Sequence, residues 1–255
     1  MTGANEPDVV GTPRLHLRST DSTNERAIVL ALQGAPHGTL VTAGEQTAGR
    51  GRQGRHWTAP AGRALLGSII VREPPELVPL IAAVAVAEAI EETLASNADD
   101  SAPAADHPAA SSTRKTAIKW PNDIHLAGLK VAGILVEGRP QEGWAVVGIG
   151  VNVALRPQDF PAELRDRAGT LGLGPDAIEP LLERLLAALT RWLGAPADVL
   201  LDAWRARDAL LGQQVKWEGG RGLATGIDGD GRLVIDLDPG PGRVALEAGE
   251  VHLAG

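Results

Sequence analysis

The change of pattern after Leu211 is the feature that most restricts the fold of this chain. Upstream of it, apolar runs of helical and of strand length alternate. Downstream, short apolar runs are separated by glycine-rich turns, and Asp228-Gly-Asp-Gly231 is a typical hairpin signal. These short runs are residues 213–217, 222–227, 232–237 and 243–246. Four or five short strands in under fifty residues predict a small β-barrel. We therefore expect a mixed α/β domain at 13–210 and a small β domain at 211–255.

Local patterns predict the elements of the larger domain. Ser22-Thr-Asn-Glu25 has the form of a capping box, which indicates a helix that starts there and stops at Gly34. Further helices are expected at 76–95, 178–193 and 197–210, and strands at 38–42, 64–71, 116–120, 130–137 and 144–153. Residues 1–12 are expected to be a flexible tail. The Ala-, Pro-, Asp- and Ser-rich stretch 97–112 has little apolar surface to bury, so we expect a disordered insertion there.

Composition excludes several classes of site. The 255 residues include no cysteine, so disulfides, cysteine-bound metals and thiol nucleophiles are excluded, and we assign no residue to a resident metal. The first residues lack the basic and apolar regions of a signal peptide. The most apolar run, 77–90, is too short for a bilayer and contains Pro79 and Glu88. We expect a cytoplasmic protein with no membrane partner.

One basic segment stands out against a net charge of −8, which does not favour nucleic-acid binding. Within fourteen positions it holds Arg50, Arg52, Arg55, His56 and Arg63. A local anion site explains this cluster, and from charge alone a solvated basic loop explains it equally well.

The glycine spacing in this segment formally matches a dinucleotide fingerprint. Gly49-Arg-Gly-Arg-Gln-Gly54 has the form G-x-G-x-x-G, but no helical sequence follows its third glycine. A dinucleotide fold requires that helix, and no G-K-[ST] of a Walker loop follows either. Glycines of this kind let a backbone approach an anion, and arginines hold carboxylate or phosphate oxygens through paired N–H groups. Trp57 lies in polar surroundings and is expected to be an exposed platform for a base, with a partly buried loop anchor as the alternative.

Two further clusters carry polar residues next to apolar runs. Lys119-Trp-Pro-Asn-Asp123 is expected to turn at Pro121 and present Asn122 and Asp123 outward, and Lys130 precedes a buried strand. A solvated lysine and an ordinary turn are the alternative. Asn152 ends an apolar strand, where either a nucleotide contact or a satisfied core amide accounts for it.

Together these segments resemble the biotin protein ligase family. The resemblance covers nearly all of the chain after residue 13, and it rests on five motifs in the family's order and spacing. They are Ser22-Thr-Asn24, Glu45-Gln-Thr-Ala-Gly-Arg-Gly-Arg-Gln-Gly-Arg-His-Trp57, Lys119-Trp-Pro-Asn-Asp123, Lys130-Val-Ala-Gly-Ile-Leu-Val-Glu137 and Gly148-Ile-Gly-Val-Asn152. The resemblance implies a class II aminoacyl-tRNA-synthetase-like mixed-sheet catalytic domain followed by an SH3-like β-barrel.

The resemblance also implies an activity and roles for residues. Such a ligase forms biotinyl-5′-AMP from biotin and ATP with Mg²⁺, then transfers biotin to a lysine of a biotin carboxyl carrier protein. Biotin contacts are expected from Ser22, Thr23, Asn24, Gln46, Gly49, Arg50, Gly51, Arg52, Lys130 and Gly133. Contacts to ATP or the adenylate are expected from Arg50, Arg52, Trp57, Lys119, Asn122, Lys130 and Asn152. Arg50, Arg52, Lys130 and Asp123 are the catalytic candidates, with Asp123 orienting or deprotonating the incoming lysine.

Two other functions remain as alternatives. A lipoate ligase has the same architecture and adenylation chemistry, and a catalytically silent module would only sense biotin or nucleotide. The arginine loop and the C-terminal β segment favour biotin, and the presence of Lys130 and Asp123 favours an enzyme. About a dozen residues precede the first expected strand, so we do not expect the DNA-binding domain of the repressor members. The chain is expected to be a monomer or a homodimer.

Overall fold

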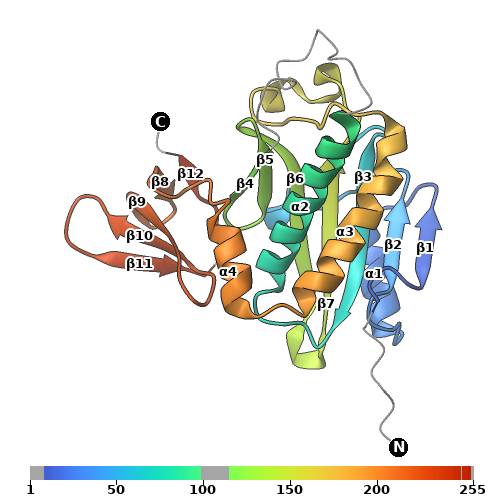
Figure 1. Ribbon diagram of the computed structural model, residues 1–255, viewed down its shortest axis with the longest axis horizontal. Coiled ribbons are helices and arrows are strands. Elements are labelled where there is room, and N and C mark those ends of the chain that lie inside the picture. Colours follow the sequence, from blue (N-terminus) through green and yellow to red (C-terminus); the bar gives the residue numbers. More distant parts are fainter. Residues whose placement is uncertain (1–8, 99–114, 248, 254–255) are drawn as a thin grey trace, which may run out of the picture.

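The computed structural model describes residues 9–98, 115–247 and 249–253. Its centre is a seven-stranded mixed sheet in the order β1-β2-β3-β7-β6-β5-β4 (Figure 1). The strands are β1 (Arg14–Leu17), β2 (Leu40–Ala43), β3 (Ala64–Arg72), β4 (Thr116–Lys119), β5 (Asp123–Leu126), β6 (Leu129–Arg139) and β7 (Trp144–Asn152). β1 and β2 run parallel, and the other neighbours in this sheet run antiparallel. The expectation of a mixed α/β fold is confirmed.

Helices cover both faces of this sheet. α2 (Val78–Ala98) and α3 (Ile178–Leu193) lie on one face (Figure 1). Residues 78–90 of α2 are buried almost all round because they lie between the sheet and α3. α1 (Thr23–Leu32) packs Ala27 and Ala31 against Val41 and Ile70 in a separate cluster on the other face. Each fully buried leucine or isoleucine of such a core contributes about 1.5–3 kcal/mol.

The C-terminal segment forms a five-stranded antiparallel sheet in the order β11-β10-β9-β8-β12. Its strands are β8 (Gln214–Trp217), β9 (Gly220–Ile227), β10 (Leu233–Leu237), β11 (Arg243–Leu246) and β12 (His252–Leu253), and α4 (Ala197–Arg205) precedes them. This sheet shares a core with the larger one, because Val215 and Leu233 belong to the same apolar cluster as α2 and α3. The Trp120 indole also donates a hydrogen bond to the Gly231 carbonyl at 3.1 Å.

The structure differs from the sequence expectations where tertiary contacts override local pattern. The turn expected at Pro121 forms, but it leads directly into β5, an unexpected strand that pairs with both β4 and β6. The helix expected to reach residue 210 ends at Arg205, because residues 207–209 add to β4. The Ile118 amide donates to the Arg207 carbonyl, and the Ala209 amide donates to the Ile118 carbonyl.

The N-terminal tail and the insertion are only partly described. Residues 1–8 lie outside the described ranges, but residues 9–12 are not loose: Val10 is 4% exposed and the Gly11 amide donates to the Gly38 carbonyl. Of the expected insertion, 97 and 98 end α2 and 99–112 lie outside the described residues. Within the described ranges, none of the helices combines the length and apolarity needed to cross a bilayer.

Candidate active site

A cavity of about 710 Å³ opens on the face of the sheet around β4 to β7. Its walls come from the glycine loop at 50–58, the segment 160–168 and the C-terminal residues 249–253. This volume is typical of a pocket for a small ligand or cofactor. Of the fifteen site residues expected from sequence, all but Asn24 and Gly49 line this cavity.

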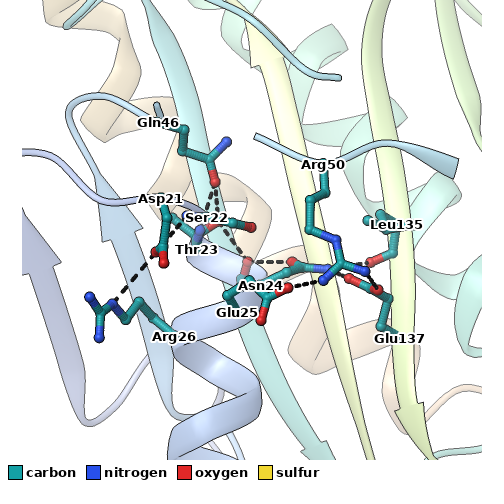
Figure 2. A network of polar contacts seen from close by, with 11 residues as sticks. Asp21, Ser22, Thr23, Asn24, Glu25, Arg26, Gln46, Arg50, Leu135 and Glu137 are labelled. Atoms are coloured by element: carbon teal, nitrogen blue, oxygen red, sulfur yellow. Dashed lines mark hydrogen bonds and ion pairs between the residues drawn. The ribbon is translucent and has the colours of Figure 1, made fainter. Parts of the chain in front are cut away.

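At one end of the cavity, a polar group surrounds the first turn of α1. The Gln46 side-chain oxygen accepts hydrogen bonds from the Thr23 amide at 2.7 Å and the Thr23 hydroxyl at 3.0 Å (Figure 2). Ser22 is the N-cap residue, but its side chain makes no capping bond, and Glu25 faces Arg50 instead. The expected helix therefore forms, but the reciprocal capping box does not.

Asn24 lies behind this wall, with its amide fully engaged. Its oxygen lies 2.6 Å from the hydroxyl of fully buried Ser68, and its nitrogen donates to the Leu135 carbonyl and to Glu137 at 2.9 Å. Asn24 thus braces α1 against β3 and β6 rather than facing the cavity. Ser68 and Glu137 were not expected from sequence, because their contacts depend on residues more than forty positions away.

Arg50 is held between two carboxylates. One terminal nitrogen pairs with Glu25 and the other lies 2.6 Å from Glu137 (Figure 2). These two contacts anchor the glycine loop to α1 and β6 while the guanidinium still lines the cavity. A guanidinium has five N–H donors, so donors remain for an anion.

Arg52 is anchored on the other side of the loop. Its guanidinium donates to the Asn122 side-chain oxygen at 3.1 Å, and Asn122 donates to the Ile134 carbonyl at 2.7 Å. Burial lowers the pKa of Arg52, and the charge of Asp123 opposes that shift. Burying this cation costs free energy, and a bound anion offsets that cost.

Trp57 does not form the exposed platform expected from sequence. Its indole is half-buried over two glycines of neighbouring strands, and a Cβ on Gly150 would lie 2.6 Å from the ring, one on Gly133 3.0 Å. Because Gly133 and Gly150 have no side chains, the two strands leave a flat slot at this point, and the indole fills it. The indole N–H is buried without an acceptor, and the Lys130 ammonium lies 5.9 Å from the ring centroid.

Charged side chains from β4, β5 and β6 also line the cavity. Lys130 forms an ion pair with Asp123 at 2.7 Å, and burial lowers the pKa of the nearby Lys119. Asn152, at the end of β7, donates to the Gly169 carbonyl at 2.9 Å and is 5% exposed. Asn152 is thus a satisfied core amide that also borders the cavity.

Three features of the site escaped sequence reasoning. They are Glu137 beneath Arg50, His125 on β5, and the segment 249–253, whose Glu250 pairs with Arg55 of the loop. The alternation of β5, with Ile124 and Leu126 buried, would have identified the face of His125 had the strand been expected.

Comparison with known proteins shows which family has this sequence. Residues 16–153 match the biotin/lipoate A/B protein ligase family, which is more than half of the chain. The chain belongs to this family. A biotin–[acetyl-CoA-carboxylase] ligase of Paracoccus denitrificans is 37% identical over 256 residues, which cover 94% of this chain and 100% of that protein. The family resemblance drawn from the five motifs is confirmed.

Other relatives differ in length. The bifunctional ligase/repressor BirA of Bacillus subtilis is 39% identical over 173 residues, and this chain spans about half (47%) of its length. Among solved structures, the biotin protein ligase of Aquifex aeolicus in complex with biotin and ATP is 27% identical with a TM-score of 0.73, covering 95% of this chain and 100% of that one. The expected class II synthetase-like fold with a C-terminal β domain is confirmed for this family member.

Proposed function

We propose that this chain is an ATP-dependent biotin protein ligase that makes biotinyl-5′-AMP and transfers biotin to a lysine of a biotin carboxyl carrier protein. The observation that carries the proposal is a single cavity that joins three groups. They are a polar wall of Thr23 and Gln46, the arginines of the glycine loop, and the Lys130–Asp123 pair.

In the first half-reaction, the biotin carboxylate attacks the α-phosphorus of ATP and the bond to pyrophosphate breaks. Both reactants are anions, so the protein must position them and compensate their charge. Arg50, Arg52 and Lys130 supply that positive charge around the carboxylate and α-phosphate. The hydrogen-bonding groups of Ser22, Thr23 and Gln46 suit the urea of the biotin head, which both donates and accepts.

The nucleotide is proposed to lie between the glycine loop and the far end of the sheet. Trp57 then covers the adenine, and Lys119, Asn122 and Asn152 border the nucleotide. Gly49 shapes the loop, while Gly51 and Gly133 let the backbone approach the ligand. Mg²⁺ enters as part of the substrate MgATP. Magnesium sites in nucleotide enzymes use one or two carboxylates with the phosphates, and no group of three metal-binding side chains occurs among residues 9–98, 115–247 and 249–253.

In the second half-reaction, the carrier lysine attacks the acyl carbon of the adenylate and AMP leaves with the bonding electrons. A cavity closed by the loop excludes water from this reactive anhydride. Asp123 is suited to orient the incoming amine, because its carboxylate is already held by Lys130.

The deciding experiment supplies purified protein with MgATP and either biotin or lipoate, and follows pyrophosphate release and then carrier labelling. We expect release and labelling with biotin only. Release with lipoate instead indicates a lipoate ligase, and binding without release with either acid indicates a sensing module. Either result rejects the proposal.

A further inference from the structure

His125 lies on the cavity wall beside the charged pair of β5 and β6. On β5, Ile124 and Leu126 point into the core, so Asp123 and His125 share the opposite, cavity-facing side. In the β5–β6 register, His125 lies opposite Lys130. Residues opposite one another in antiparallel strands have Cβ atoms about 4.5–5.5 Å apart, so His125 and Lys130 adjoin on the cavity-facing side of the two strands.

A backbone contact fixes the tautomer of this ring. Nδ1 of His125 lies 3.2 Å from the Gly128 carbonyl, in the turn where Ala127 and Gly128 both have positive φ. A carbonyl only accepts, so Nδ1 carries the hydrogen, and in the neutral ring Nε2 has a free lone pair. Burial is the largest influence on this imidazole and lowers its pKa; Lys119 and Lys130 lower it further, while Asp123 and the Gly128 contact raise it.

The transfer step needs a proton acceptor at this place. A lysine side chain has an ordinary pKa of about 10.4, so at neutral pH it arrives as an ammonium that cannot attack a carbonyl. Asp123 is engaged by Lys130 at 2.7 Å. Lys119 and Lys130 oppose a further positive charge here, so a proton taken from an arriving ammonium has to pass on to solvent rather than stay in the cavity.

We propose that His125 is a catalytic residue of the transfer step, with Nε2 as the base that deprotonates the acceptor lysine. This inference rests on the proposed ligase function and adds a residue to it. Nε2 takes one proton from the ammonium, and the neutral amine attacks the acyl carbon. The C–N bond forms, the C–O bond to the phosphate of AMP breaks, and AMP leaves with the electron pair. The second amine proton and the one on the imidazole pass to solvent.

The test variant is His125→Asn, because an asparagine amide can still donate to the Gly128 carbonyl but has no equivalent of Nε2. The protein is loaded with biotin and MgATP, the bound adenylate is isolated, and a single turnover is started with either carrier protein or hydroxylamine. Hydroxylamine is already neutral at neutral pH, so it needs no base for its first deprotonation. We expect carrier labelling to slow by about 100-fold or more. Pyrophosphate release and the reaction with hydroxylamine should be unchanged.

Several outcomes overturn the proposal. Carrier labelling within a few-fold of the unaltered protein shows that Nε2 is not the base, and equal slowing with both nucleophiles shows a merely structural role. If the variant forms no adenylate, added biotinyl-5′-AMP replaces the first step and the same comparison decides. His16→Asn on the edge strand β1, which contacts Thr42 and does not line the cavity, is the control. If the unaltered protein releases no pyrophosphate with biotin, the proposed ligase function itself is rejected. This result differs from a failure of the His125 proposal, in which the unaltered protein still releases pyrophosphate.

Discussion

Glu137 on β6 and Arg50 on the glycine loop form an ion pair of 2.6 Å, while the other oxygen of Glu137 accepts a hydrogen bond from Asn24 at 2.9 Å. One carboxylate therefore connects the loop over the cavity with the buried side of α1. The side chains of Arg50 and Glu137 are 42% and 21% exposed, so the pair is partly screened by solvent.

Glu137→Gln tests this connection. The amide keeps the shape but loses the charge that holds Arg50, so the loop is less well anchored. We expect kcat/KM for ATP in adenylation to fall about fivefold, or about 1 kcal/mol. Glu142→Gln, which removes the exposed partner of Arg139 at the end of the same hairpin, should leave it unchanged. Equal kcat/KM values for the two variants would show that Glu137 does not hold the loop through Arg50.

Gly150→Ala tests the slot under Trp57. The added methyl group would lie 2.6 Å from the indole, so the ring must move off the sheet. We expect the KM for ATP in pyrophosphate release to rise about tenfold, or about 1.4 kcal/mol. Gly229→Ala, at an exposed turn where a Cβ meets nothing within 4 Å, serves as the control. An unchanged KM would show that the position of the indole does not matter for the nucleotide.

Ser68→Ala tests the buried link between Thr23 and Asn24. The substitution leaves the Asn24 oxygen buried without its donor, which costs about 1–3 kcal/mol of unfolding free energy. Urea denaturation measures this loss, and the KM for biotin should rise with it. Ser96→Ala, on the exposed end of α2, is the comparison. A stability equal to that of the unaltered protein would refute the role given to Ser68.

Asp208→Asn tests a half-buried carboxylate between α4 and β8. Burial raises the pKa of Asp208, and its Oδ2 is buried without a partner. The ionised form is therefore disfavoured in the folded protein, and its cost is fully present above the folded pKa. As pH falls through the raised folded pKa to the ordinary value, this cost disappears.

The variant should accordingly melt at a higher temperature than the unaltered protein at neutral pH, with a difference that narrows on acidification. Thermal unfolding at a series of pH values measures it. A difference that widens toward low pH has the wrong sign and excludes this origin.

Local chemistry in the sequence determined much of this protein. The capping-box pattern placed α1, apolar runs of helical length placed α2 and α3, the glycine-rich turns placed the C-terminal strands, and the motif order indicated the family. Thirteen of the fifteen expected site residues line one cavity, because motifs of this kind lie at strand ends and loops that the sheet brings together. Their individual roles stay predictions.

Tertiary structure decided what depends on distant partners. Trp57 is half-buried because glycines on β6 and β7 happen to be adjacent in the register, which no local pattern encodes. Asn24 faces Ser68 and Glu137 rather than the cavity because two other strands supply its hydrogen bonds. α4 ends early because the chain after it pairs with β4, and β5 exists because β6 lies beside it. In each case the energy that selects the structure comes from groups far apart in the chain, so only the folded arrangement fixes it.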